Sequence, residues 1–463
     1  MAKVVVFLDH EIMIRHFVKS GVFQPLERQH EVVYVFPEQH RRVTTNPADL
    51  DLPRFRLMPV SNERAFRWRR FYHATALRRA RGSENQQFLF EFFRESLGGR
   101  AFLQSWILSW PLTNWFYRKR LLKRLGTNAA LEALLSEERP DVVLHPTVLE
   151  GLFVSDLVRW GERHETPVAF LMNSWDNPST KAMAIGYPDW LVVWGPQTKR
   201  HAVQHLGMPE DRILCFGAAQ FDVYRDPPRE SREEILERLG FSPHQKTLLY
   251  AGSSKRLNEV EHLQRLEEAI DQGVLPDCQI LFRPHPWRGI IAGEADFFSV
   301  PWKYVRMDDQ MAHYYRESRE HATLIFTPDY GHTHAVLSAV DAVVSPVSTI
   351  LLEAALHGKP ILAYMPKEEI GENLFFKTMM NMNFMRDFFT QVDCRLCHSS
   401  SGFIEACRSL LRSCDDPSLS ERLRQQTTYF IANPGTSYGE QLVSLVDRLV
   451  SRSEEPVEVA VHG

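Results

Sequence analysis

The sequence predicts an α/β protein with two doubly wound domains, each a parallel sheet covered by helices. Short β-branched runs alternate with stretches of helical spacing, first from "KVVVFLD" at 3–9 and again from "KTLLYAG" at 246–252. Strands that alternate with helices in this way form parallel sheets with right-handed crossovers. A proline-rich, charged stretch near 225–235 divides the chain into halves of similar size. We expect it to be the linker between the domains.

The first domain is expected to cover residues 1–225. After its opening strand, "EIMIRHFVKSGVFQPLERQ" has helical spacing and "HEVVYVFP" is the next strand. Further strands are expected at "PDVVLHP", "PVAFLMN", "WLVVWG" and "RILCFG". Residues 60–125 break the alternation, because Trp, Phe and Tyr stand there among Arg and Lys. This stretch is predicted to be a helical insert.

The second domain is expected to cover residues 236–430. Its strands are predicted at "KTLLYAG", "CQILFRP", "HATLIFTP", "DAVVSP" and "KPILAYM". Residues 431–463 begin with apolar positions at helical spacing and end in a polar tail. We expect a last helix that crosses back to the first domain, followed by a frayed end.

Composition narrows the classes of function. The chain has 463 residues, a formal net charge of -4 and a pI near 6.6, which disfavours nucleic-acid binding because a binder needs a basic surface. The apolar run at the N-terminus is too short for a signal peptide. Six cysteines spread over a long chain disfavour a disulfide framework. We therefore expect a cytoplasmic protein.

The insert raises the question of membrane contact. Its apolar part is interrupted by polar residues and falls short of the roughly 20 apolar residues that span a bilayer. Aromatic side chains beside cations suit a helix lying at the membrane interface, so peripheral contact with the inner membrane through 94–125 is one interpretation. A helix pair that packs on the sheet with a solvated basic face is the other.

Ligands of parallel sheets bind at the carboxyl ends of strands, and three such junctions in the second domain have the chemistry of a phosphate site. Glycine allows close approach, hydroxyls and amides at a helix start bind anions, and Arg, Lys and His donate hydrogen bonds. The Gly-x4-Gly-Lys spacing of a Walker loop is absent. The alternatives are ordinary helix caps, a histidine satisfied by backbone and an exposed carboxylate. The residues expected at this phosphate site are Gly252, Ser253, Ser254, Lys255, Arg283, His285, Pro286, Ser348, Thr349 and Glu353.

The first domain is expected to supply a base and an acceptor site. A base must lie within hydrogen-bond reach of the acceptor hydroxyl. Asp176 is the first candidate, Asp9 the second and Glu150 the third, since all three follow predicted strands. For Asp176 the alternative is a turn or capping carboxylate. The expected acceptor-binding residues are His10, Arg15, Asn173 and Trp175, whose indole would stack on a sugar.

No metal site is predicted. The Asp-x-Asp pair at Asp49 and Asp51 lies in a proline-flanked loop. "CRLCH" at 394–398 matches a haem attachment pattern or half of a zinc site. Neither interpretation is favoured, because an export signal and a second cysteine pair at suitable spacing are missing.

At these motifs the sequence resembles a known group of enzymes. The segments "GSS", "RPHP" and "SPVSTILLEAALHGKP" at 252–254, 283–286 and 345–360 are similar to the C-terminal domain of GT-B glycosyltransferase-like enzymes. The group serves bacterial surface and capsular polysaccharide biosynthesis. It includes CMP-sugar transferases with a His-Pro motif, CDP-glycerol glycerophosphotransferases and, more distantly, non-hydrolysing UDP-GlcNAc 2-epimerases. The stretch 173–224 also resembles relatives of these transferases.

The resemblance implies a GT-B-like architecture, with two Rossmann-type domains facing a cleft. It also implies that His285 contacts the donor phosphate, that Ser348 and Thr349 hold it, and that Arg283 and Lys255 assist. Fixed hydrogen-bond donors at this place would stabilise the charge that grows on the departing nucleotide, so catalysis would need no metal and no cofactor.

The expected function is transfer of a sugar or polyol phosphate from a CMP-, CDP- or UDP-linked donor to a glycan or lipid-linked acceptor. Two alternatives remain open. One is a nucleotide-sugar 2-epimerase of the same fold, and the other is a non-catalytic nucleotide-sugar-binding scaffold. The sequence does not distinguish inversion from retention.

Overall fold

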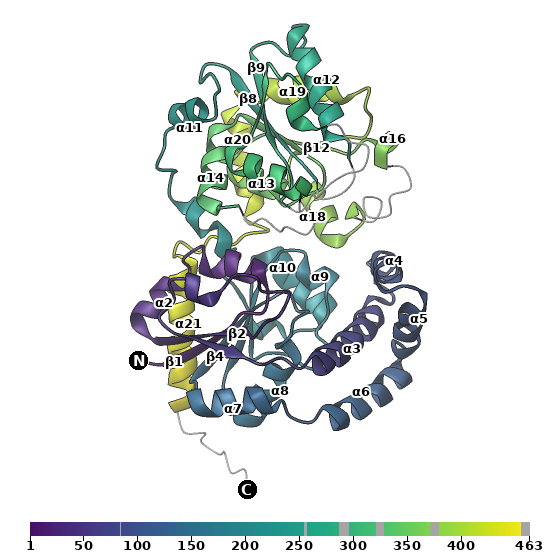
Figure 1. The fold of residues 1–463 in the computed structure, drawn as a ribbon, viewed down its shortest axis with the longest axis vertical. Helices are drawn as coiled ribbons and strands as arrows, with labels where there is room; N and C mark the ends of the chain where they lie inside the picture. The colour runs from purple at the N-terminus through teal and green to yellow at the C-terminus, as the bar shows by residue number, and fades with distance from the viewer. Residues whose placement is uncertain (84, 254–256, 287–295, 321–327, 371–378, 455–463) are drawn as a thin grey trace. The chain divides into compact units, whose positions relative to one another are not determined.

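The computed structural model describes residues 1–83, 85–253, 257–286, 296–320, 328–370 and 379–454. The chain divides into two units. Unit 1 comprises Met1–Asp222, Met382–Phe384 and Tyr429–Gly463, and unit 2 comprises Val223–Asn381 and Met385–Thr428. Figure 1 shows the strands and helices of both. The predicted α/β class is confirmed, since each unit is built on a parallel sheet covered by helices.

Unit 1 contains a seven-stranded parallel sheet of order β3-β2-β1-β4-β5-β6-β7. In chain order its strands are β1 (Lys3–Phe7), β2 (Glu31–Pro37), β3 (Phe55–Met58), β4 (Val142–Thr147), β5 (Val168–Met172), β6 (Trp190–Val193) and β7 (Ile213–Cys215). The central strands are buried along nearly their whole length, as expected of aliphatic runs in a sheet with both faces covered. The register pairs Val4 with both Val32 and Val142.

Helices cover both faces of this sheet. They are α1 (Glu11–Met13), α2 (Gln24–Gln29), α3 (Asn62–Ala80), α4 (Gln86–Leu97), α5 (Gly99–Leu108), α6 (Pro111–Leu125), α7 (Ala129–Glu138), α8 (Val154–His164), α9 (Asn177–Thr180), α10 (Pro196–His201) and α21 (Tyr438–Glu454). Two π-helical turns, η1 (Ile14–Val18) and η3 (Ala202–Leu206), and the 3-10 turns η2 (Pro47–Asp49), η4 (Glu210–Arg212) and η5 (Ala219–Arg225) complete the elements.

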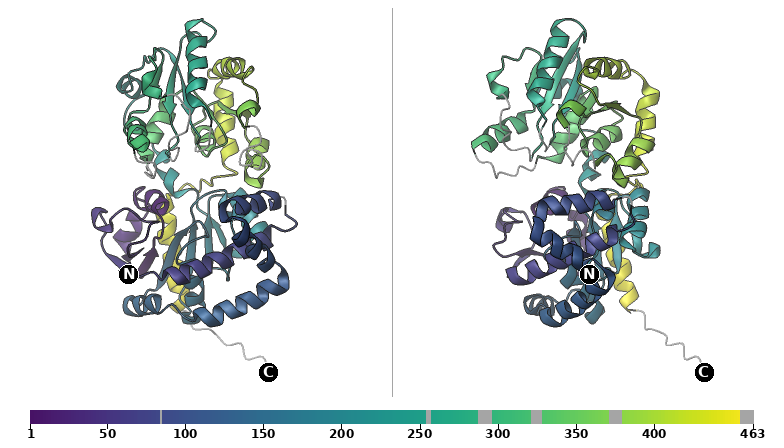
Figure 2. Two further views of the ribbon diagram at one scale, coloured as in Figure 1. Left: turned by 45° about the vertical axis from the view of Figure 1, so that its right-hand side comes forward. Right: turned by 90° about the vertical axis from the view of Figure 1, so that its right-hand side faces the viewer.

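The aromatic and basic stretch forms the helices α3 to α6. Ser61 caps α3 by accepting a hydrogen bond from the amide of Arg64, and α3 packs against α4, α5 and α6. The two views of Figure 2 show these helices as a layer at the side of the unit 1 sheet. The connections after α4 and α6 are glycines with positive φ, Gly98 and Gly126, a conformation that suits the end of a helix.

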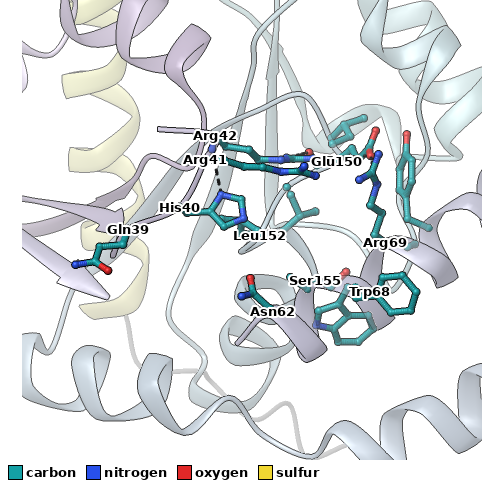
Figure 3. Close-up of a pocket in the computed structure, with 17 residues that line it drawn as sticks. Gln39, His40, Arg41, Arg42, Asn62, Trp68, Arg69, Glu150, Leu152 and Ser155 are labelled. Atoms are coloured by element: carbon teal, nitrogen blue, oxygen red, sulfur yellow. Dashed lines mark hydrogen bonds and ion pairs between the residues drawn. The ribbon is translucent and has the colours of Figure 1, made fainter. Parts of the chain in front are cut away.

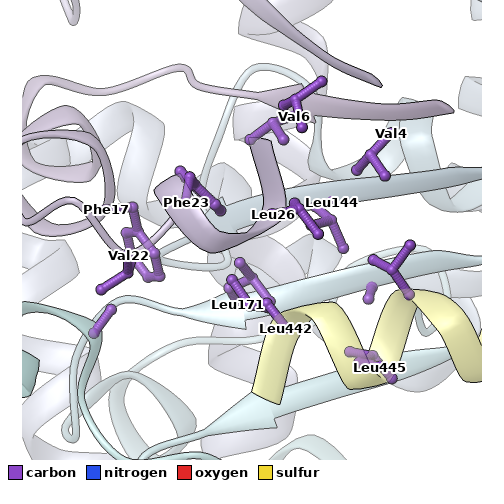
Figure 4. Packing of buried hydrophobic residues seen from close by; sticks show 14 of the residues in the cluster. Val4, Val6, Phe17, Val22, Phe23, Leu26, Leu144, Leu171, Leu442 and Leu445 are labelled. Carbon is purple, nitrogen blue, oxygen red and sulfur yellow. The ribbon is translucent and has the colours of Figure 1, made fainter. Parts of the chain in front are cut away.

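The last helix, α21, belongs to unit 1 although unit 2 precedes it in the chain. It lies beside α2 and β4. Leu442 and Leu445 are fully buried in the same apolar cluster as Val4 and Leu144 (Figure 4). The cluster fills one face of the sheet.

Unit 2 contains a six-stranded parallel sheet of order β10-β9-β8-β11-β12-β13. The strands are β8 (Lys246–Ala251), β9 (Cys278–Arg283), β10 (Val305–Met307), β11 (Ala342–Ser345), β12 (Ile361–Tyr364) and β13 (Cys394–Cys397). The helices are α11 (Arg232–Arg238), α12 (Glu259–Asp271), α13 (Asp309–Glu320), α14 (Tyr330–Ala339), α15 (Ile350–Leu356), α16 (Lys367–Ile370), α18 (Asn383–Gln391), α19 (Phe403–Arg412) and α20 (Pro417–Thr427), with the 3-10 turn η6 (Phe297–Ser299). The strand expected at "HATLIFTP" lies outside the described residues apart from Pro328. The strands β3, β10 and β13 were not expected.

Candidate functional site

Unit 2 brings the three predicted donor junctions to one edge of its sheet. They follow β8, β9 and β11, and β8 lies between the other two strands. All three strands run parallel, so their carboxyl ends meet at the same edge. The three predicted junctions therefore lie together at one edge of the sheet.

The first junction uses its backbone amides internally. The amide of Gly252 donates to the carbonyl of Arg283 at 2.8 Å, and that of buried Ser253 donates to a carboxylate oxygen of Glu259 at 2.5 Å. A Cβ added at Gly252 would lie 2.5 Å from the other oxygen of Glu259. The glycine therefore makes room for a buried carboxylate, which corrects the expectation that Gly252 and Ser253 offer open amides to a phosphate. Ser254 and Lys255 lie outside the described residues.

The second junction contains a buried ion pair. Arg283 is 7% exposed, and its guanidinium lies 3.4 Å from Asp308 and donates to the hydroxyl of Thr333 at 2.7 Å. Burial alone would raise the pKa of Asp308, but Arg283 and His332 more than offset this and hold that pKa below its usual value. Arg283 thus ties β9 to neighbouring elements, and its role as a donor ligand stays a prediction. His285 and Pro286 come just after it and are half-buried, so His285 stays a candidate.

The third junction places Ser348 and Thr349, both half-buried, immediately before α15. The carbonyl of Thr349 accepts the amides of Leu352 and Glu353. Glu353 itself is buried, and one carboxylate oxygen accepts a hydrogen bond from the hydroxyl of Tyr224 at 2.7 Å. One carboxylate oxygen of Glu353, which was expected to bind the donor, therefore already accepts a hydrogen bond from a residue of its own unit.

Two groups of potential metal ligands in unit 2 do not favour a bound ion. Within the described part of the chain, Asp308, Asp309 and His332 form a group that could hold an ion, but the cation beside Asp308 is Arg283. Cys394 and Cys397 are the two ends of β13. Residues three apart in a strand point to opposite faces, so these two thiols do not face a common ion.

In unit 1 the three candidate bases follow β1, β4 and β5, which are neighbours in the sheet. Asp9 is fully buried and accepts the amide of Leu152. A side chain at Gly151 would collide with Asp9. One oxygen of the carboxylate therefore fixes the loop after β4, and the catalytic role of Asp9 stays a prediction.

Asp176 is half-buried at the start of α9. Its two carboxylate oxygens accept the hydroxyls of Ser174 at 2.5 Å and Thr180 at 3.1 Å. Asp176 remains a candidate base. These hydrogen bonds also fit the alternative interpretation, in which Asp176 is a turn or capping carboxylate. Trp175 is 2% exposed, and its ring packs edge-on against Phe384 and Phe430. Its predicted stacking on a sugar is wrong, because the indole is part of the core.

The other acceptor candidates lie at the same edge. His10 is half-buried and caps α1 through its Nδ1, which accepts the amide of Ile12 at 3.1 Å. Arg15 is half-buried on η1. Asn173 is buried and hydrogen-bonds His16. Burial lowers the pKa of His16 to about 3, helped by Arg15. Asn173 is thus placed to orient an imidazole rather than to bind an acceptor directly.

A pocket of about 390 Å³ opens beside these residues. Its walls come from the loop after β2 (39–42), from α3 (62–72) and from the loop after β4 (149–155). Gln39 and Leu149 line it with φ of 47° and 63°. Non-glycine residues adopt such angles at an energetic cost and cluster at functional sites.

Glu150 lies among cations in this pocket. Its carboxylate is 3.9 Å from Arg42, 3.5 Å from Arg69 and 3.6 Å from Lys181. Burial would raise the pKa of Glu150, but Lys181 and the arginines lower it below its usual value. Figure 3 shows Arg41 and Arg42 side by side, extending toward Glu150, with Arg69 approaching from α3. The sequence interpretation missed Arg41, Arg42 and Arg69, although "HRR" at 40–42 follows a predicted strand and met the same rule as the other junctions.

Comparison with solved structures agrees with this architecture. A wall teichoic acid polymerase, TagF, superposes with a TM-score of 0.52 at 9% identity over 98% of this chain and 90% of that chain. A TagF variant soaked with CDPG gives 0.50 and 11%, over 98% and 90%. A proposed UDP-N-acetylglucosamine 2-epimerase from Listeria monocytogenes gives 0.51 and 10%, over 98% of each chain.

The fold is GT-B-like. At such identity the likeness concerns the fold alone. No protein-family model matches the sequence, and no curated protein matches it either. The expected architecture of two Rossmann-type units is thus confirmed from the three-dimensional comparison.

Proposed function

We propose that this GT-B-like chain transfers a sugar or polyol phosphate from a nucleotide-activated donor to a glycan or lipid-linked acceptor in surface polysaccharide assembly. The observation that carries the proposal is the set of three junctions on the adjacent strands β9, β8 and β11. Of the residues expected there, His285, Ser348 and Thr349 keep partly exposed side chains. These groups would donate hydrogen bonds to the donor phosphate and stabilise the charge that develops as the transferred group departs.

The acceptor hydroxyl would be activated by a carboxylate of unit 1. Asp176 and Glu150 are both half-buried and follow neighbouring strands. The pKa of Glu150 is held below its usual value, so it stays ionised at neutral pH but is a weak base. We keep Asp176 as the first candidate, because its carboxylate oxygens accept hydrogen bonds from hydroxyls, whereas the carboxylate of Glu150 lies among cations. A metal-independent reaction remains part of the proposal.

The second candidate is a nucleotide-sugar 2-epimerase, favoured by the similar fold of the Listeria monocytogenes protein described above. The two reactions differ in stoichiometry. A transferase releases nucleotide only when an acceptor is present, whereas an epimerase interconverts the donor without one. A scaffold would bind the donor and turn over none.

Thermal shift with CMP, CDP, UDP, GDP and their sugars tests donor binding. A ligand at 100 times its Kd stabilises the native state by about 2.7 kcal/mol, which raises the melting temperature by a few degrees. We expect one nucleotide to do so, and His285→Ala to remove at least half of that shift. His313→Ala is the control, because His313 is exposed on α13. If none of these nucleotides or sugars shifts the parent protein, the proposal is refuted.

We also propose that α5 and α6 contact an anionic membrane surface, where a lipid-linked acceptor would be held. Trp106, Trp110 and Trp115 are 37%, 49% and 46% exposed. Arg81 lies over the ring of Trp110 at 4.1 Å and Lys119 over that of Trp115 at 3.8 Å. Aromatic rings beside cations match the headgroup level of a bilayer. No helix in the described ranges is long and apolar enough to cross a bilayer.

A further inference from the structure

The pocket around Glu150 has an excess of positive charge. Arg41, Arg42 and Arg69 line it together with one carboxylate, Glu150. That carboxylate pairs with Arg42 and Arg69 and also with Lys181, so it cannot balance the three arginines of the pocket. A doubly charged anion in the pocket would reduce the repulsion among them.

Hydrogen bonds hold Arg42 between two loops. Arg42 donates to the carbonyl of Glu150 at 2.8 Å, and its own carbonyl accepts the amide of Glu11 at 2.8 Å. The amide of Arg42 also donates to Nδ1 of His40 at 3.2 Å. These bonds tie the loop after β2 to the loop after β4. The position of Arg42 and of the two loops is therefore fixed before any ligand arrives.

Arg41 differs from Arg42 in its contacts. Within the described part of the chain, no hydrogen bond or ion pair of Arg41 is found, although it lines the pocket and its guanidinium extends toward Glu150. A planar guanidinium binds phosphate oxygens in pairs. Arg41 is thus the group that a phosphate would engage at least cost, with Arg69 on the other side.

The opposite wall is aromatic. Phe66, Trp68 and Tyr72 line the pocket from α3, and Phe66 is 65% exposed. An aromatic wall beside a cationic one suits a ligand that joins a phosphate to a carbon-rich group. Tyr72 also feels the charges of both Glu150 and Asp176, so the pocket lies near the candidate base.

We propose that Arg41, Arg42 and Arg69 bind a phosphate group of the acceptor. A phosphate monoester carries nearly two negative charges at neutral pH, which suits this cluster better than a carboxylate does. The inference rests on the proposed function, since it names the class of acceptor for that reaction. Phosphate on a soluble sugar or polyol and phosphate on a lipid share this chemistry.

The test measures binding to the whole chain without donor. Isothermal titration uses glycerol 3-phosphate as the soluble probe, phosphatidic acid in phosphatidylcholine vesicles as the lipid-borne probe and glycerol as the neutral control. We expect at least one phosphate probe to bind and glycerol to be at least tenfold weaker. The double variant Arg41→Gln/Arg69→Gln should bind the phosphate probe at least tenfold more weakly. The probe that binds identifies the source of the phosphate.

Two single variants sharpen the result. Arg67 is on α3 but pairs with Glu63 and lines a different pocket, so Arg67→Gln should change the affinity less than twofold. Glu150→Gln removes the carboxylate among the cations and should tighten phosphate binding. Weaker binding by a Glu150→Gln variant with an unchanged melting temperature would overturn the proposal, and so would equal affinity in the double variant or no binding of either phosphate probe.

The thermal-shift experiment with nucleotides and the titration with phosphate probes can fail independently of each other. The melting-temperature shift with nucleotides reports on unit 2, whereas the phosphate probes report on unit 1. If a nucleotide binds and neither phosphate probe does, only the acceptor inference is refuted. If no nucleotide binds, the proposed function is refuted whatever the pocket binds.

Discussion

At the scale of single residues, buried histidines make the stability of unit 1 depend on pH. His73 on α3 is buried, with its ring 5.1 Å from that of Phe93. Burial lowers the pKa of His73 to about 4, although the charge of Glu150 opposes the shift. The pKa in the unfolded chain is near 6.5, so the unfolded state takes up the proton first. Stability from this group is complete above about pH 6.5 and is lost as the pH falls toward 4.

We expect His73→Phe to reduce this loss, because Phe keeps a ring in the site without a titrating group. Between pH 7 and pH 5 the parent should lose about 2 kcal/mol more unfolding free energy than the variant. Urea unfolding of unit 1, followed at each pH, measures the difference. His313→Phe serves as the control, since His313 is exposed on α13. Equal pH dependence in the parent and His73→Phe would refute the assignment.

Single residues also show why part of the site could not be predicted. The sequence placed Gly252, Arg283 and Trp175 at the ends of strands. In the structure Gly252 directly follows β8, Arg283 is the last residue of β9, and Trp175 lies three residues after β5. Their partners are distant in the chain or side chains whose direction the pattern does not specify. Asp308 neutralises Arg283, Glu259 occupies the space beside Gly252, and Phe430 covers Trp175. Residue type and position predicted that these residues lie at the carboxyl edge of a sheet. They did not predict which side chains remain accessible to a ligand.

At the scale of elements, α4 to α6 leave an unusual amount of apolar surface exposed. The large apolar side chains of this region that stay exposed are Phe92, Leu103, Trp106, Ile107, Trp110, Leu112, Trp115 and Phe116. An apolar area of this kind indicates a surface that contacts something else. The cations over its tryptophans favour an anionic partner.

We expect the triple change of Trp106, Trp110 and Trp115 to Ser to weaken binding to phosphatidylglycerol vesicles at least tenfold. Vesicle co-sedimentation measures the loss. The parent should also bind less at high salt, because ions screen the attraction of Lys and Arg to the lipid. A triple change of Val223, Phe298 and Leu396 to Ser removes similarly exposed apolar groups from unit 2 and should have little effect. Absence of binding by the parent would exclude the membrane surface.

The same scale shows the strength and the limit of sequence patterns. Aliphatic runs located the buried inner strands of both sheets, because buried parallel strands need such residues on both faces. The pattern did not locate β3 (Phe55–Met58), β10 (Val305–Met307) or β13 (Cys394–Cys397), which are short strands at the sheet edges and only partly buried. It also did not locate the arginine pocket. The walls of that pocket come from segments that lie far apart in the sequence, at 39–42, 62–72 and 149–155.

At the scale of the whole molecule, the chain completes unit 1 only at its end. Six residues of α21 belong to the apolar cluster that also contains Val4, Leu26 and Leu144. Unit 2 is synthesised between these two parts of the cluster. Residues 1–222 therefore lack part of their core until α21 arrives, and the stability of unit 1 depends on that helix.

We expect the double change of Leu442 and Leu445 to Ala to destabilise unit 1 selectively. Both side chains are fully buried, and a buried Leu→Ala change costs about 2–5 kcal/mol. Limited proteolysis followed by mass spectrometry should then show faster cleavage within residues 1–222 than within 236–428. Leu410→Ala is the matched control, because Leu410 is fully buried in the core of unit 2, and its variant should give the reverse pattern. Equal acceleration in both segments would mean that the units unfold together and that α21 stabilises the whole chain rather than unit 1.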